Sequence, residues 1–320
     1  MSDAIVCEGL TKQYNSRVVL NNLFLKIPEN TVFGFLGPNG AGKTTTMKIL
    51  TGQIKPSGGK AHVAGVEVKI GSPESRRFTG YLTETPNYYG WMTGRELLEW
   101  VGELFGMTAS DRKARSKELL RLVGIEEAGN RKVVTYSGGM RQRLGIAQAL
   151  VNRPRVVFLD EPVSALDPVG RRDVLLLLDR IRQDTTVFMS SHVLTDVDRV
   201  CDHVAILDKG NLIVTGSTSE LKERYSHPAL WITLEGGYPE ALKLAESLKT
   251  LPEVKYAIPD EYGRVNLELV NEQAVHKAGQ YIPHMISEMN LNLAGYQAAI
   301  PNLEEIFIRV VNQKEEVKQA

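Results

Sequence analysis

Apolar and polar positions along the chain follow two different periods. Three short, predominantly apolar segments, at residues 32–36, 156–159 and 185–189, have the composition of strands that are buried on both faces of a sheet. Segments in which apolar residues recur with the helical period, such as 44–50 and 139–151, lie between the first two. This alternation of buried strands and helices predicts an α/β fold with a mainly parallel sheet.

Turn and helix-start signals extend the prediction to neighbouring segments. Residues 5–28 alternate apolar and polar side chains and are interrupted at Asn15-Ser16 and Asn21-Asn22, which predicts short strands joined by turns. The further predicted elements are helices that begin at Ser72-Pro73 and at the capping box of Thr93 and Glu96, a mostly helical stretch over 95–122 with a break near Gly106, and a hairpin over 204–214.

The last third of the chain predicts a second, smaller domain. Residues 225–228, Tyr-Ser-His-Pro, have the composition of a linker, which places the domains at 1–225 and 226–320. The elements after the linker follow the order βαββαβ of the ferredoxin-like plan. The predicted strands lie at 230–234, 254–258, 265–270 and 291–299, the helices at 239–248 and 273–289, and an added terminal helix at 303–311.

Composition limits the possible partners. The chain has 320 residues, of which 42% are hydrophobic and 24% charged, as in ordinary globular proteins of more than one domain. Lys plus Arg and Asp plus Glu both number 38, so no net charge would hold the chain on nucleic acid, and we expect no nucleic-acid partner. Cys7 and Cys201 have no metal-ligand spacing and are interpreted as small buried side chains in a reducing compartment.

The sequence contains no recognisable targeting or membrane-spanning segment. Residues 1–10 lack the basic region and long apolar core of a signal peptide. Nowhere do about 18 consecutive apolar residues occur, the length that a spanning helix needs. We therefore expect a cytoplasmic protein that does not cross the membrane itself.

Residues 37–44, Gly-Pro-Asn-Gly-Ala-Gly-Lys-Thr, fit the P-loop pattern at every position and lie between a predicted buried strand and a helix. Glycines let the backbone curl so that its N–H groups point toward phosphate oxygens, and the helix N-terminus adds a favourable dipole. Lys43 would place a positive charge on the outer phosphates, and the Thr44 hydroxyl can ligate magnesium. The alternative is a chance glycine-rich turn; alone, the motif indicates only nucleotide binding.

Two carboxylates follow the second buried strand. Asp160 and Glu161 come directly after residues 156–159, at the end of the strand that would lie beside the phosphate site. Asp160 is suited to the Mg²⁺ shell, and Glu161 to polarising, as general base, the water that attacks the terminal phosphate. An acidic turn after a core strand is the alternative, and the upstream P-loop disfavours it.

A third signal, Tyr-Ser-Gly-Gly-Met-Arg-Gln-Arg at 136–143, is weak alone, since such triplets occur in ordinary loops. Together with the P-loop, Leu-Asp-Glu-Pro at 159–162, Ser-Ala-Leu-Asp at 164–167 and Ser-Ser-His at 190–192, it reproduces the motif order of ABC ATPases. Residues 1–225 thus closely resemble the nucleotide-binding domain of that family. The resemblance implies a parallel core sheet, an antiparallel β-subdomain and a helical subdomain at about residues 86–152.

The resemblance also implies roles for individual residues. His192 matches the switch histidine that contacts the terminal phosphate, and Asp167 would lie at the interface with a second copy of the chain. The alternative for His192 is an exposed or core histidine. Tyr14 stands where the family has an aromatic ring that stacks on adenine, and its alternative is a tyrosine on a strand surface. The residues implied to bind ATP are Tyr14, Gly37, Asn39, Gly40, Ala41, Gly42, Lys43, Thr44 and Thr45, with Ser137, Gly138 and Gly139 contacting the ATP of the other copy in a head-to-tail sandwich dimer.

One position departs from the family pattern. Glu84 stands where the family usually has a glutamine that senses magnesium and water. A carboxylate can ligate Mg²⁺, but it also adds negative charge near the phosphates. If the alignment is shifted by one residue, Thr83 or Thr85 would occupy the position instead.

Residues 86–92, Pro-Asn-Tyr-Tyr-Gly-Trp-Met, are rich in aromatic side chains. In the family this region receives a cytoplasmic helix of the membrane subunit, so we expect some of these rings to line a docking groove. The alternative is that they pack the core of the helical subdomain.

The motifs together predict the ATP-hydrolysing subunit of an ABC transporter, with ATP and Mg²⁺ as cofactors and a separate membrane permease that would hold it at the inner face of the cell membrane. The arrangement of one motor domain followed by a tail that ends Ile-Pro-Asn-Leu-Glu-Glu-Ile-Phe at 300–307 most resembles bacterial exporter ATPases paired with six-helix permeases. The alternatives are a soluble ABC ATPase that acts on ribosomes or DNA, and an ATP-dependent regulatory subunit. The absence of a tandem motor, heptads and a basic patch argues against the soluble ATPase.

Overall fold

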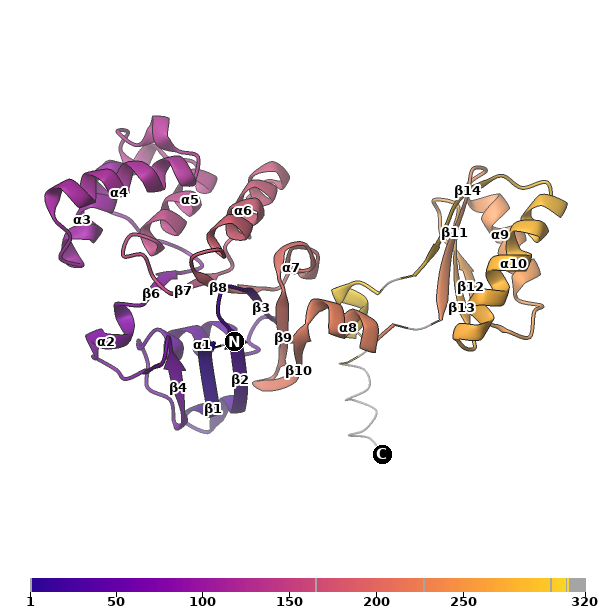
Figure 1. Ribbon diagram of the computed structural model, residues 1–320, viewed down its shortest axis with the longest axis horizontal. Helices are drawn as coiled ribbons and strands as arrows, with labels where there is room; N and C mark the ends of the chain where they lie inside the picture. Colours follow the sequence, from indigo (N-terminus) through magenta and orange to yellow (C-terminus); the bar gives the residue numbers. More distant parts are fainter. Residues whose placement is uncertain (1, 165, 227, 300, 309, 311–320) are drawn as a thin grey trace. The chain divides into compact units, whose positions relative to one another are not determined.

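The computed structural model describes residues 2–164, 166–226, 228–299, 301–308 and 310 (Figure 1). The first part of the chain contains a mainly parallel sheet and an antiparallel sheet, together with helices. The chain divides into two compact units, one comprising the residues up to Ser219 with part of the segment after Ile306, and the other comprising Glu220–Ile306. Ala165 of the predicted 164–167 motif, His227 of the predicted linker, and Arg309 and Val311 of the predicted terminal helix lie outside the described residues.

The larger sheet of the first unit has the strand order β10-β9-β3-β8-β7-β6, with β10 antiparallel to β9 and the other neighbours parallel. Every residue of β3, β7 and β8 is buried, as their apolar composition predicts. Register pairs Asp160 with Ser190 and Leu36 with Ser191, so the carboxyl ends of these strands meet at one edge. The strands are β3 (Val32–Leu36), β6 (Thr79–Leu82), β7 (Val156–Asp160), β8 (Thr186–Ser191), β9 (His203–Asp208) and β10 (Asn211–Ser217).

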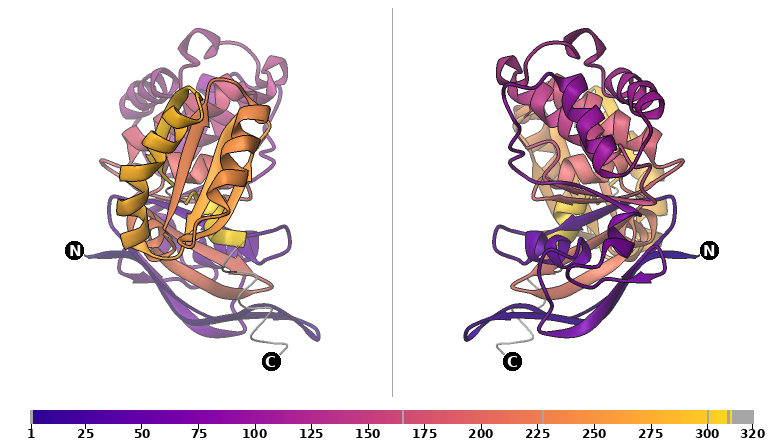
Figure 2. Two further views of the ribbon diagram at one scale, coloured as in Figure 1. Left: turned by 90° about the vertical axis from the view of Figure 1, so that its right-hand side faces the viewer. Right: turned by 90° about the vertical axis from the view of Figure 1, so that its left-hand side faces the viewer.

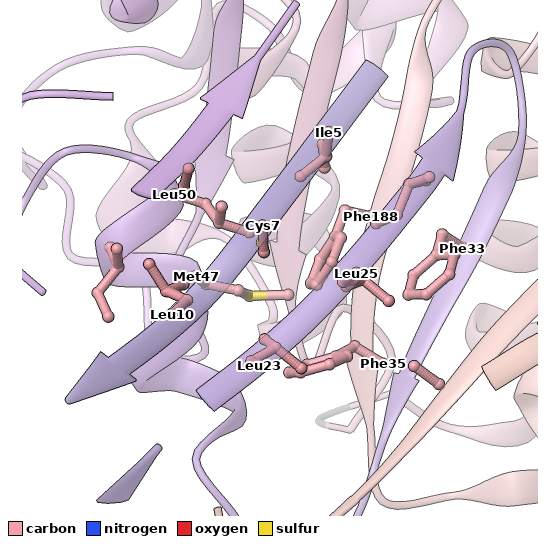
Figure 3. Packing of buried hydrophobic residues seen from close by; sticks show 14 of the residues in the cluster. Ile5, Cys7, Leu10, Leu23, Leu25, Phe33, Phe35, Met47, Leu50 and Phe188 are labelled. Carbon is pink, nitrogen blue, oxygen red and sulfur yellow. The ribbon is translucent and has the colours of Figure 1, made fainter. Parts of the chain in front are cut away.

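A smaller antiparallel sheet shares its core with the larger one. It has the order β2-β1-β4-β5, where β1 is Asp3–Tyr14, β2 Arg17–Pro28, β4 Gly58–Val63 and β5 Val66–Glu67. Figure 3 shows Leu23 and Leu25 of this sheet beside Phe35 and Phe188 of the larger sheet, whose rings lie 5.2 Å apart. This shared core fixes the strand that leads into the P-loop.

The predicted break of the second strand at Asn21-Asn22 is wrong. β2 continues through both residues, and the irregularity is absorbed as register shifts in its pairing with β1. Asn22 and Gly9 have positive φ angles of 49° and 63°, and the Asn22 N–H donates to Thr11 Oγ1 at 3.1 Å. The asparagines therefore mark an irregularity of the β-bulge type rather than a turn.

Helices begin after Ser72 and Thr93, where the start signals predict them. Thr93 forms the expected capping box: its Oγ1 accepts the Glu96 N–H at 3.2 Å, and Glu96 Oε2 accepts the Thr93 N–H at 2.8 Å. The helices of this unit are α1 (Lys43–Leu50), α2 (Pro73–Arg76), α3 (Gly94–Leu104), α4 (Ala109–Leu122), α5 (Gly138–Ala149), α6 (Pro168–Ile181) and α7 (Leu194–Val200), with 3₁₀ turns at Glu126–Ala128 and Val133–Thr135; α8 (Thr218–Arg224) spans the division between the units.

The second unit has the predicted βαββαβ order. Its antiparallel sheet runs β12-β13-β11-β14, the ferredoxin-like arrangement in which the first and third strands are central. α9 and α10 lie side by side on one face of this sheet (Figure 2, left), where buried Leu, Ile, Val and Ala side chains form a separate core. Its elements are β11 (Ala229–Leu234), α9 (Tyr238–Leu248), β12 (Val254–Pro259), β13 (Arg264–Leu269), α10 (Glu272–Glu288) and β14 (Leu293–Ala298); residues 303–308 are also helical.

Candidate nucleotide-binding site

The P-loop joins β3 to α1 in a conformation that requires glycine. Gly37 and Gly42 have φ angles of 153° and 110°. A Cβ on Gly37 would lie 2.2 Å from Leu207 O, and one on Gly42 would lie 2.8 Å from Val19 O. The backbone is thus pressed against its neighbours, and larger residues at these positions would open the loop.

A cleft of about 360 Å³ opens over the P-loop, and a second cleft of about 400 Å³ adjoins it. They share Val19 and four P-loop residues, Pro38 to Ala41. The first cleft is lined by Val19, Pro38, Asn39, Gly40, Ala41, Gly42, Lys43, Thr44, Thr45, Glu84 and Glu161, and the second also by Arg17, Val18, Asp208 and Lys209. All the P-loop residues predicted to bind ATP except Gly37 therefore line one cavity.

Ser190 ties the two predicted carboxylate residues together. Its Oγ donates to Asp160 Oδ1 at 2.6 Å and accepts the Glu161 N–H at 3.0 Å. Asp160 and Ser190 are paired across β7 and β8, and both are buried. Glu161 follows with a φ of +50°, an uncommon angle for a residue with a side chain.

The Glu161 carboxylate lies between Lys43 and His192. Its Oε1 is 3.6 Å from Lys43 Nζ, and its Oε2 is 2.9 Å from His192 Nδ1. The Lys43 and Glu161 side chains are both 7% exposed, whereas that of His192 is 48% exposed. Lys43 Nζ also donates to Gly37 O at 2.6 Å, so the ammonium lies against the P-loop backbone. A positive charge, a carboxylate and an imidazole thus converge where the P-loop cleft ends.

Glu84 lines the cleft, whereas Thr83 and Thr85 do not contribute to its lining. Glu84 also affects Tyr81, whose phenol pKa is raised by burial and further by the charges of Asp160 and Glu84. Of the three residues that the sequence left open, Glu84 is the one on the P-loop side.

The other predicted contacts lie away from this cavity. Ser137 caps α5, where its Oγ accepts the Met140 N–H at 3.2 Å, and Asp167 caps α6, where its Oδ1 accepts the Gly170 N–H at 2.7 Å. Both caps are exposed and absent from the lining of the two clefts. Gly138 and Gly139 form the first turn of α5 beside Ser137. One copy of the chain therefore does not bring these residues to its own P-loop.

Tyr14 stands at the end of β1, with 46% of its surface exposed and Lys12 Nζ 4.7 Å from its ring centre. It does not contribute to either cleft, so adenine stacking by Tyr14 stays a prediction. Ser190, in contrast, belongs to the site but was not assigned a role from the sequence. Its place in Ser-Ser-His at the end of a buried strand was the signal that pointed to it.

Comparison with known proteins shows the family of the chain. Residues 20–164 match a protein family described as ABC transporter. An uncharacterized ABC transporter ATP-binding protein of Bacillus subtilis, YxlF, is 36% identical over 307 residues, which cover 95% of this chain and 98% of the relative. The chain belongs to the ABC transporter ATP-binding proteins. The predicted family and fold class are therefore confirmed.

Two further comparisons concern transport and dimerisation in relatives. This ABC protein is 30% identical over 321 residues to the daunorubicin resistance ATP-binding protein DrrA3 of Streptomyces coeruleorubidus, with 99% of this chain and 98% of the relative covered. It is 25% identical, with a TM-score of 0.61, to a solved ATP-binding cassette whose dimer is in a post-hydrolysis state bound to ADP and phosphate. That match covers 67% of this chain and 98% of the cassette.

The ABC protein is thus an ATP-binding subunit of a transporter and hydrolyses ATP to drive transport. Every helix within the described residues is too short or too polar to cross a bilayer.

Proposed function

We propose that this ABC protein energises export through a separate membrane permease, with Glu161 as the general base of ATP hydrolysis. The observation that carries the catalytic assignment is the convergence of Lys43, Glu161 and His192 at the end of the P-loop cleft. The fold delivers these residues from α1, β7 and the end of β8 to one point. Lys43 and Glu161 both line the first cleft and are absent from the lining of the second.

Each member of the cluster has a distinct role in the proposed chemistry. The P-loop N–H groups and Lys43 bind the phosphate oxygens. The buried carboxylate of Glu161 accepts a proton from the attacking water, and its backbone, held by Ser190, cannot turn away from the cleft. His192 contacts the same carboxylate and is exposed enough to reach the terminal phosphate.

The site also fits a magnesium ion. Magnesium in nucleotide sites is held by one or two protein oxygens together with substrate phosphates, and when bound it neutralises charge on those phosphates. Thr44 lines the cleft, and Asp160 lies at the strand end with one carboxylate oxygen fixed by Ser190. We assign these two residues as ligands, with Glu84, which also lines the cleft, as a third.

A second copy of the chain completes the proposed site. Two exposed helix starts do not line the P-loop cleft. They are the start of α5, with Ser137, Gly138 and Gly139, and the start of α6, with Asp167. Exposed N–H groups at a helix start bind anions. We infer that these helix starts meet the nucleotide of a second copy in a head-to-tail dimer.

The permease contact is proposed from an exposed aromatic patch on the helical part of this unit. Tyr89 is 54% exposed, Trp91 70% and Trp100 39%. Tyr89 holds the patch together, with ring centres 6.0 Å from Trp91 and 5.6 Å from Trp100. Large aromatic side chains on a water-exposed surface mark interaction sites.

Tyr88 behaves differently from its neighbours, so the 86–92 segment divides between the two alternatives. Its hydroxyl donates to Arg141 O at 3.2 Å, and burial raises its pKa. Tyr88 therefore packs against α5, inside the helical part, and we exclude it from the permease contact.

Export is the direction that the relatives favour. DrrA3 is named for daunorubicin resistance, LnrL of Bacillus subtilis for linearmycin resistance and BcrA of Bacillus licheniformis for bacitracin transport. We propose that the cargo of this system is likewise chosen by the permease.

The test is affinity isolation of the tagged full-length chain from membranes of its own source. We expect a multi-helix membrane protein to co-purify. Isolation of ribosomes or DNA instead of a membrane protein would overturn the transport proposal.

A further inference from the structure

An ion pair joins the two helices that follow the proposed dimer contact and the proposed switch histidine. Arg171 lies in the first turns of α6, one helical turn after Asp167. Asp196 lies in the first turn of α7, four residues after His192. Arg171 Nη1 is 3.6 Å from Asp196 Oδ2, and α6 packs against α7.

Asp196 is buried, Arg171 is half-buried, and the ion pair between them is not fully formed. The Asp196 side chain is 4% exposed and that of Arg171 34%. A separation of 3.6 Å is too long for a hydrogen bond. Within the described part of the chain, Asp196 Oδ2 and Arg171 Nε have no hydrogen-bond partner although both atoms are buried.

The charges around Asp196 do not supply the missing hydrogen bond. Burial raises the pKa of its carboxyl, opposed by the charges of Arg171, Arg199 and His192. A buried polar atom without a partner is unfavourable, and a guanidinium can bind a carboxylate through two parallel hydrogen bonds. A small shift of α6 toward α7 that closes this gap would therefore be stabilised.

We propose that Arg171 and Asp196 are positioning residues that transmit dimer closure from Asp167 to His192. When a second copy contacts the start of α6, the pair closes and holds the start of α7 in place, so that the contact between His192 and Glu161 is locked. This inference rests on the proposed function, because it assumes the roles of Asp167, His192 and Glu161.

The first experiment measures steady-state ATP hydrolysis and equilibrium ATP binding by the full-length chain. For Arg171→Gln and Asp196→Asn we expect kcat to fall by about fivefold or more, with the dissociation constant for ATP unchanged. The double variant should be no worse than either single variant, because both remove one interaction. Asp196→Glu keeps the carboxylate charge on a side chain that can still contact Arg171, and this variant should retain most of kcat.

Arg172→Gln is the matched control, since Arg172 is the next residue of α6 and is exposed. Its kcat should equal that of the wild type. An equal loss in Arg172→Gln, or single losses that multiply in the double variant, would overturn the proposal. A fall in ATP affinity in the single variants would do the same, because it would indicate general damage to the site.

The second experiment needs no turnover. Amide hydrogen exchange of residues 194–200 should slow when ATP is added to the wild type, and not when it is added to Arg171→Gln. If Glu161→Gln hydrolyses ATP like the wild type, the proposed base is wrong, while the exchange result still decides the role of the pair. Protection that is the same in wild type and Arg171→Gln would refute the coupling.

Discussion

His192 Nδ1 lies 2.9 Å from Glu161 Oε2, although the two residues come from different strand ends of the sheet. The same carboxylate lies 3.6 Å from Lys43 at the start of α1. Parallel pairing of β3, β8 and β7 brings these ends together, so the catalytic cluster depends on strand order as well as on residue type.

The first prediction concerns Glu161→Gln. We expect kcat for ATP hydrolysis to fall by about 10²–10⁴-fold, because the amide cannot accept the proton. ATP should still bind, and size-exclusion chromatography with ATP should show a dimer. Lys43→Ala is the contrasting variant, in which ATP binding itself should weaken by about tenfold or more. Turnover of Glu161→Gln at the wild-type rate would remove Glu161 from the mechanism.

Ser190→Ala tests the contact that the sequence did not assign. The substitution removes the hydroxyl that donates to Asp160 Oδ1 and accepts the Glu161 N–H. Both buried groups then lose a hydrogen-bond partner. We expect thermal unfolding to report a loss of about 1–3 kcal/mol, and kcat to fall at saturating ATP. Ser191→Ala is the matched control, since Ser191 bonds within its own turn through Val193. Equal effects in both variants would contradict a specific role of Ser190.

Much of this architecture follows from local patterns, and the exceptions are long-range. The P-loop, the capping box at Thr93 and the order of the second unit are encoded in neighbouring residues. The bulge at Asn22 was misinterpreted because asparagine with positive φ serves both turns and bulges. β4, β5 and β6 were not predicted: β5 has only two residues, and β4 and β6 contain glycine, which is depleted in strands.

The side-chain contacts of the site were less predictable still. The type of Glu161 and of His192 indicated their chemistry, but their 2.9 Å contact depends on the pairing of distant strands. The same holds for the Arg171–Asp196 pair, which spans two helices. Tyr88 and Trp91 are both aromatic and only three residues apart, yet Tyr88 is half-buried and Trp91 exposed. A local sequence does not show which face of a loop meets α5.

Glu84→Gln tests whether the carboxylate belongs to the metal shell. Without divalent ions, removal of a negative charge near the phosphates should tighten ATP binding, by about fivefold for one charge at partly screened distance. With Mn²⁺ as probe, electron paramagnetic resonance should show weaker ion binding by the nucleotide complex of the variant. If the affinities for ATP and for Mn²⁺ both equal those of the wild type, Glu84 lies outside the metal shell. Thr85→Val is the control for substitutions in this segment that do not change the charge.

Trp91→Ala and Tyr88→Ala separate docking from packing. Trp91 is 70% exposed, so its removal should leave the free energy of unfolding within about 0.5 kcal/mol of the wild type. Loss of an aromatic anchor should nevertheless weaken the permease complex by about 2 kcal/mol, seen as loss of the membrane partner in pull-down at equal expression. Tyr88→Ala should instead lower the melting temperature by about 4 °C or more, since it removes a packed ring and its bond to Arg141 O. A stable Trp91→Ala chain that retains both partner and transport would show that the permease docks elsewhere.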